Sequence, residues 1–68
     1  MGKEHLNYVT CLNNIGTVYS RIGQYEKAID YYQSALLINE NILGKNHPGY
    51  ANSLFNIGAV YSKMERYN

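Results

Sequence analysis

The chain has 68 residues, of which 46% are hydrophobic and 16% are charged, and its formal net charge is +1. A chain this short builds one small core, which stabilises the fold by only ~3–5 kcal/mol. The six Lys and Arg residues are dispersed, which argues against nucleic-acid binding, and no apolar run approaches the ~20 residues of a membrane span. The lone cysteine, Cys11, cannot close an internal disulfide, so we expect a reducing, cytoplasmic environment.

The first predicted helix covers residues 5–22, with bounds that are approximate at both ends. Apolar residues recur there at alternating spacings of four and three, which is typical of one stripe along an α-helix. The stripe consists of Tyr8, Leu12, Ile15, Tyr19 and Ile22. Gly23 follows directly, and a glycine in this place can adopt the left-handed conformation that ends a helix.

The second predicted helix covers residues 25–43, again approximately. Its stripe consists of Tyr25, Ile29, Tyr32, Leu36 and Leu43, with Ala28 and Ala35 beside it. Gly44 is expected to end this helix for the same reason that Gly23 ends the first one.

The third predicted helix covers residues 47–65. Asn46 can cap its first turn, and Pro48 is tolerated there because the first amides of a helix have no partner within it. The apolar stripe consists of Tyr50, Leu54, Ile57, Tyr61 and Met64. Glu65 stands where the first helix has its terminal glycine, so the third helix is expected to run on or to fray.

An internal repeat relates the first helix to the third. Residues 2–26 and 44–68 align with an offset of 42, and twelve of the 25 aligned pairs are identical. A fixed period of this size is typical of a solenoid, in which each unit packs on its neighbours and presents a surface. The sequence therefore predicts an all-α fold in one unit, 1–68, with a complete repeat at 2–43 and the first half of a second at 44–68.

Two repeat-related glycines, Gly16 and Gly58, lie inside predicted helices. Each costs ~1 kcal/mol relative to alanine in a helix interior. With Ala28 and Ala35 on the second helix, the simplest cause is the close approach of two antiparallel helices, where glycine leaves room for a neighbouring side chain.

Several residues at the helix contacts resemble the signature of the tetratricopeptide repeat, and they are Leu12, Ile15, Gly16, Tyr19, Ala28, Tyr32 and Ala35. The period of 42 and the run from Ile42 to Pro48 are similar to the longer variety found in kinesin light chain. About one and a half repeats are present. The resemblance implies a helix-turn-helix solenoid whose first helices line a groove for peptides of partner proteins.

The same resemblance nominates groove residues on the first and third helices. They are Asn13, Asn14, Thr17 and Arg21, with Phe55, Asn56, Ala59 and Lys63 as counterparts. An asparagine amide can pair with the backbone of an extended peptide, and the two cations would favour an acidic partner segment. In the alternative interpretation, the asparagines bond to a neighbouring helix and the cations only stabilise helix C-termini.

No arrangement of residues indicates catalysis, a cofactor or a metal site. The two histidines, His5 and His47, are repeat equivalents at helix starts and have no second ligand nearby, so we expect them to cap or pack. A nucleophile with its base, a carboxylate pair in a cleft and a phosphate-binding loop are all missing from the pattern. The sequence predicts a non-enzymatic protein that binds protein or peptide.

Self-association is the competing hypothesis. The third helix lacks a second helix to cover its stripe, and the residues expected to be open are Leu54, Ile57, Tyr61 and Met64. Burying ~400 Å² of this surface would contribute ~10 kcal/mol before entropic costs. A homodimer or larger homo-oligomer, with two third helices joined about a two-fold axis, would cover it.

Overall fold

The computed structural model describes residues 2–67, with the side chains of residues 7–66, and shows three helices. They are α1 (Gly2–Arg21), α2 (Tyr25–Ile42) and α3 (Pro48–Tyr67). The prediction of an all-α helical-repeat fold is confirmed, and no strand occurs in the described residues. The third helix runs on to Tyr67, as expected from the replacement of the terminal glycine by Glu65.

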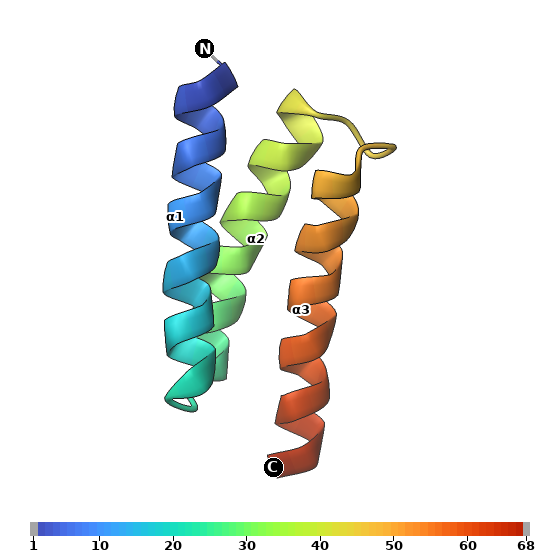
Figure 1. Ribbon diagram of the computed structural model, residues 1–68. Helices are drawn as coiled ribbons and strands as arrows, with labels where there is room; N and C mark the ends of the chain where they lie inside the picture. Colours follow the sequence, from blue (N-terminus) through green and yellow to red (C-terminus); the bar gives the residue numbers. More distant parts are fainter. Residues whose placement is uncertain (1, 68) are drawn as a thin grey trace.

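The helices form a thin layer in which α1 and α3 run in the same direction on either side of the antiparallel α2 (Figure 1). The Cα atoms extend over 39 × 20 × 13 Å, so α2 is the one helix of the described fold that is covered from two sides. None of these helices has the length and hydropathy needed to cross a membrane.

Both glycine stops are confirmed by the backbone conformation. Gly23 has a φ of +84° and Gly44 has a φ of +85°, a region in which any other residue would be strained. Beyond Gly23, the amide of Gln24 donates to the carbonyl of Tyr19 at 2.9 Å, which satisfies one of the last carbonyls of α1.

The third helix begins at Pro48, and His47 caps it. The Gly49 amide donates to Nδ1 of His47 at 2.9 Å, so this side chain takes the capping role that the sequence had suggested for Asn46. The expected capping function of His47 is thus confirmed. The side chain of His5, its repeat equivalent, lies outside the described residues.

The core consists of two seams along α2. Val9 and Leu12 of α1 pack with Ala35, whereas Val60 of α3 packs with a cluster on α2. The α2 members of that cluster are Ala28, Ile29 and Tyr32, as the sequence predicted.

The expected core stripe of α1 is wrong at three of its five positions. Tyr8, Ile15 and Ile22 are exposed, although Leu12 is buried and Tyr19 packs against the core. The buried face of α1 instead consists of Val9, Leu12, Gly16 and Ser20. A solenoid helix has two apolar faces, and the spacing of apolar residues does not reveal which of them has a neighbour.

Close helix approach explains Gly16. A Cβ atom at this position would lie 2.8 Å from Cε1 of Tyr32, so only glycine lets the tyrosine ring pack against the α1 backbone. The hydroxyl of Tyr32 also lies 2.7 Å from Oγ1 of Thr17. Gly58 differs, because a Cβ atom there would have no neighbour within 4 Å.

A buried polar contact sets the register between α2 and α3. The side-chain amide of Asn39 donates to Oγ of Ser53 at 2.8 Å and to the carbonyl of Gly49 at 3.1 Å. Both Asn39 and Ser53 are buried, so sliding α3 along α2 would leave these polar groups without partners.

Candidate functional site

The 42-residue offset lets each exposed apolar residue be compared with its counterpart. Val60 of α3 packs against α2 and is 2% exposed, whereas its counterpart Val18 of α1 is 57% exposed. Ile57 and Met64 likewise pack against the core, but their counterparts Ile15 and Ile22 are exposed. The residues by which α3 packs against α2 thus have counterparts on α1 that lie on its exposed side, away from α2.

The reverse comparison defines a second uncovered surface, the outer face of α3. The outer face consists of Ala51, Leu54, Gly58 and Tyr61. Their counterparts on α1 pack against α2, and they are Val9, Leu12, Gly16 and Tyr19. Leu12 is 6% exposed in its seam, whereas Leu54 is 46% exposed. All four residues of the outer face are exposed, so no helix of the described fold covers this side of α3.

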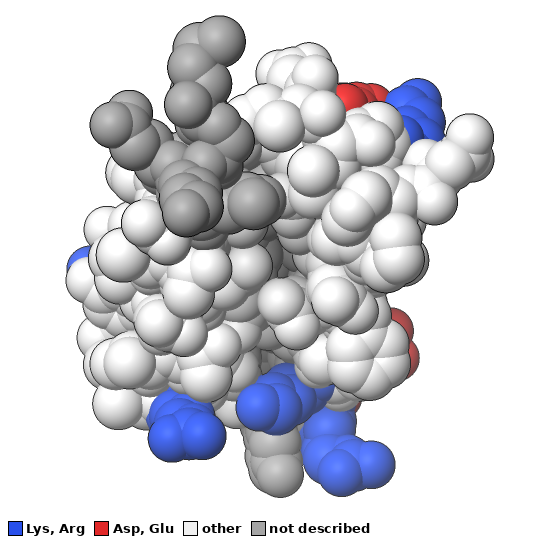
Figure 2. Space-filling model, turned by 45° about the horizontal axis from the view of Figure 1, so that its top comes forward, with Lys and Arg blue, Asp and Glu red and all other residues white. Residues whose placement is uncertain are grey.

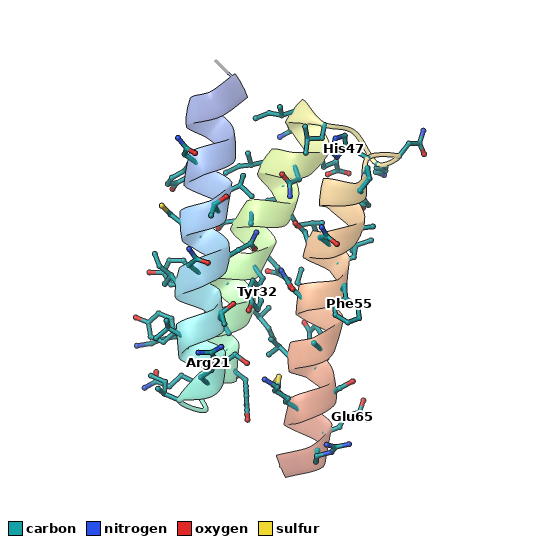
Figure 3. The ribbon with its side chains drawn as sticks, in the orientation of Figure 1. Arg21, Tyr32, His47, Phe55 and Glu65 are labelled. Atoms are coloured by element: carbon teal, nitrogen blue, oxygen red, sulfur yellow. The ribbon has the colours of Figure 1, made fainter. Side chains whose placement is uncertain are left out.

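Phe55 extends this outer face. It is 75% exposed, and Figure 3 shows it on the side of α3 that points away from α1. Its counterpart is the polar Asn13, so repeat geometry alone does not require an aromatic residue here. Phe55 was nominated for the groove, and it directly follows Leu54 of the outer face.

Two other nominated residues are engaged within the fold. Oγ1 of Thr17 donates to the carbonyl of Asn13 at 2.9 Å and also contacts the hydroxyl of Tyr32. Oδ1 of Asn13 is buried and has no hydrogen-bond partner among the described residues. Asn13 and Thr17 are both half-buried, so only part of each side chain can meet a ligand.

The repeated asparagines differ in their surroundings. Asn14 is exposed on α1, whereas Asn56 is half-buried on α3. Ala59, which corresponds to Thr17, is exposed and has no hydroxyl to offer. The amide groups are thus present on both helices, but the two repeats present them to different extents.

Cations from α1 and α3 meet at one end of the molecule. Nζ of Lys63 on α3 donates to Oγ of Ser20 on α1 at 3.3 Å. Ser20 directly precedes Arg21, so Lys63 and Arg21 lie at the same end of the molecule. Figure 2 shows Lys and Arg side chains grouped at this end of the visible face. Arg21 and Lys63 were both nominated from the sequence, and the structure brings them to the same end.

Arg66 joins this cationic end but was missed by sequence reasoning. It lines a shallow hollow together with Ser62 and Lys63, and its repeat counterpart is the neutral Gln24, so the repeat gave no signal. Within the described residues, the one ion pair joins Lys45 and Glu40 at 3.4 Å. Arg21, Lys63 and Arg66 therefore have no carboxylate partner in that part of the chain.

The described residues contain no group of three or more His, Cys, Asp or Glu side chains that could hold a metal ion. The larger surface hollow lies between the α1–α2 turn and α3, and its lining runs from Gly23 to Lys27 with Met64. Lys27 there lies over the ring of Tyr19, 5.5 Å from the ring centroid. The features that the structure brings together are those of a binding surface: an apolar helix face and an unpaired cationic end.

Comparison with known proteins agrees with this description. The family model of the tetratricopeptide repeat matches residues 8–68, which includes all of α2 and α3 and most of α1. Neither a search of curated proteins nor a search of solved structures gave a match. Tetratricopeptide repeats generally mediate protein–protein interaction and are typically non-catalytic. The matched span and the helix packing together show that the chain belongs to the tetratricopeptide repeat family.

Proposed function

We propose that this protein is a non-enzymatic interaction module that binds an acidic peptide segment of a partner protein across α1 and α3. The observation that carries the proposal is the hydrogen bond from Lys63 to Ser20, which brings Lys63 to the end of the molecule that also carries Arg21. Neither cation has a carboxylate partner among the described residues. We also propose that the chain is of the longer, kinesin-light-chain-like variety, which its period of 42 residues supports.

The charges favour an acidic segment through steering and orientation more than through raw affinity. An exposed ion pair contributes only ~0.2–1 kcal/mol, but complementary charges raise association rates and reject basic partners. The amides of Asn14 and Asn56 can pair with the backbone of an extended peptide. Together these groups would bind the acidic end of a peptide near Lys63 and the peptide backbone further along α1 and α3.

Selection from random phage-displayed dodecapeptides is expected to enrich Asp and Glu against the wild-type chain. The double variant Arg21→Gln with Lys63→Gln should lose this enrichment and bind the selected peptides about fivefold more weakly at low salt, since two exposed ion pairs are removed. Fluorescence anisotropy of the labelled peptides measures this change.

Lys45→Gln is the matched control, because Lys45 is an exposed cation at the opposite end of α3 and pairs with Glu40. It should leave both the enrichment and the affinities unchanged. Equal enrichment of acids against the wild type and the double variant would refute the role of Arg21 and Lys63.

Self-association through α3 is a second candidate function, favoured by the exposure of Leu54 and Tyr61. The sequence predicted an open strip of Leu54, Ile57, Tyr61 and Met64, but the exposed strip in the structure is narrower and keeps only Leu54 and Tyr61. Ile57 and Met64 pack against the core cluster on α2, because α3 already uses that side to bind the preceding helix. A dimer about a two-fold axis would have to join the outer faces of two α3 helices.

The self-association proposal predicts that molar mass, measured by light scattering after size exclusion, rises with protein concentration. Leu54→Glu places a charge in the joined surface and should weaken the dimer at least about tenfold. Leu37→Glu is the control, since Leu37 is equally apolar and exposed but lies on α2. A wild-type chain that stays monomeric at every concentration would exclude this function.

A further inference from the structure

Lys63 and Arg66 share one face of α3 at the cationic end. They are three residues apart, a spacing that makes two side chains neighbours on the surface of a helix. Together with Ser62 they line one shallow hollow, and all three residues are exposed. The structure thus gathers an ammonium, a guanidinium and a hydroxyl group at one accessible place.

The ammonium of Lys63 is held by α1. It donates to Oγ of Ser20 at 3.3 Å, and Ser20 is 6% exposed, so the acceptor lies in a packed part of the fold. A lysine side chain loses rotamer freedom when it is immobilised by a ligand, and this hydrogen bond restricts Lys63 before any ligand arrives. An ammonium has three donors, so two of them remain for a ligand.

Neither cation of the hollow is neutralised within the described fold. The one ion pair of the described residues joins Lys45 to Glu40. Glu65 stands between Lys63 and Arg66 in the sequence, but adjacent residues of a helix do not face each other, and Glu65 does not line the hollow. A ligand group with two negative charges would match both cations, whereas one carboxylate would match one of them.

We propose that this hollow binds a phosphorylated side chain of the partner segment, an inference that rests on the proposed function because it specifies which acidic group the cationic end binds. A phosphate ester carries a charge of about −1.5 to −2 and has three acceptor oxygens. The guanidinium of Arg66 can bind two of these oxygens at once, while Lys63 and Ser62 can donate to the third.

Phosphorylation of the partner would then regulate the complex. A neutral serine at the same position of the segment offers no charge to Lys63 or Arg66, so the unmodified segment binds weakly. A kinase that modifies this residue would switch the interaction on, and a phosphatase would switch it off.

The test compares peptides that differ at one position only. A peptide selected against the wild-type chain is synthesised with phosphoserine, aspartate or serine at its acidic position, and fluorescence anisotropy measures each affinity. The phosphoserine peptide should bind at least about tenfold more tightly than the aspartate peptide, as expected for one additional charge-assisted hydrogen bond. Equal affinities would overturn this inference and leave the proposed function intact, whereas no binding of either peptide would overturn both.

Substitutions of Arg66 distinguish a phosphate contact from a general effect of charge. Arg66→Gln should remove most of the preference for phosphoserine over aspartate. Arg66→Lys should recover only part of it, because an ammonium keeps the charge but cannot bind two oxygens in a planar fork. Lys45→Gln is the matched control and should keep the full preference, since Lys45 is paired with Glu40. An unchanged preference in Arg66→Gln would mean that Arg66 only stabilises the end of α3, and it would overturn the proposal.

Inorganic phosphate distinguishes a modified partner segment from the free ion. It should displace the phosphoserine peptide only at concentrations at least about a hundredfold above those at which the peptide binds, because it lacks the backbone contacts of the segment. Displacement at equal concentrations would show that the hollow binds the ion alone, which would contradict recognition of a phosphorylated partner.

Discussion

Asn39→Ala is expected to lower the free energy of unfolding by about 2–4 kcal/mol, because two hydrogen bonds between α2 and α3 are lost. Asn39 is 4% exposed and bonds to Ser53 and to the carbonyl of Gly49. Alanine cannot replace these bonds, and the hydroxyl of Ser53 would remain buried without its donor. Since a core of this size supplies only ~3–5 kcal/mol, much of the variant population should be unfolded at room temperature.

Urea denaturation followed by circular dichroism measures this loss. Asn41→Ala is the matched control, because Asn41 is an exposed asparagine of the same helix, and its effect should stay within about 0.5 kcal/mol. The double variant Asn39→Ala with Ser53→Ala should recover part of the loss, since both polar partners are then removed. Equal stability of Asn39→Ala and Asn41→Ala would contradict the importance of this contact.

Gly16→Ala is expected to lower the free energy of unfolding by up to about 2 kcal/mol, the upper end of the usual cost of overpacking less the gain in helix propensity. The new Cβ would lie 2.8 Å from the ring of Tyr32, which is buried and cannot move without breaking its contact with Thr17. The seam between α1 and α2 would have to open to accommodate it.

Gly58→Ala serves as the control for Gly16→Ala and should change stability in the opposite direction. Its Cβ has no neighbour, so only the helix propensity acts and stability should rise by about 1 kcal/mol. Urea denaturation of both variants and the wild type measures whether the two substitutions change the free energy of unfolding in opposite directions. If both substitutions stabilise the chain, the ring of Tyr32 does not pack on Gly16 as described.

The helices and their ends follow from local chemistry, which explains why they could be predicted. Gly23 and Gly44 take the left-handed conformation that other residues avoid, so they end helices wherever they occur in this pattern. The continuation of α3 past Glu65 follows from the same reasoning. These features depend on a few neighbouring residues and need no knowledge of tertiary contacts.

The covered faces could not be predicted as well, because burial depends on which neighbours are present. Tyr8, Ile15 and Ile22 have the spacing of a core stripe, yet they are exposed because no helix lies against that side of α1 in the described fold. The same spacing on α3 predicted four open residues, of which Leu54 and Tyr61 are exposed, whereas Ile57 and Met64 pack against the core cluster on α2.

The candidate surfaces were partly anticipated. Arg21 and Lys63 were nominated by repeat equivalence, and the structure brings them to one end of the molecule. Phe55 was nominated for the groove as the counterpart of Asn13, and its ring lies on the side of α3 that points away from α1. Arg66 has a neutral counterpart, so only the spatial arrangement of α3 revealed it.

NMR titration of the isotope-labelled chain with a selected acidic peptide tests most directly whether the cationic end binds an acidic segment. We expect the amide signals of Arg21 and Lys63 to shift, because Lys63 donates to Ser20 and so lies at the end of the molecule that carries Arg21. The amide signal of Lys45 should not shift, because this cation is already paired with Glu40. Shifts confined to the neighbourhood of Lys45 would contradict binding at the cationic end.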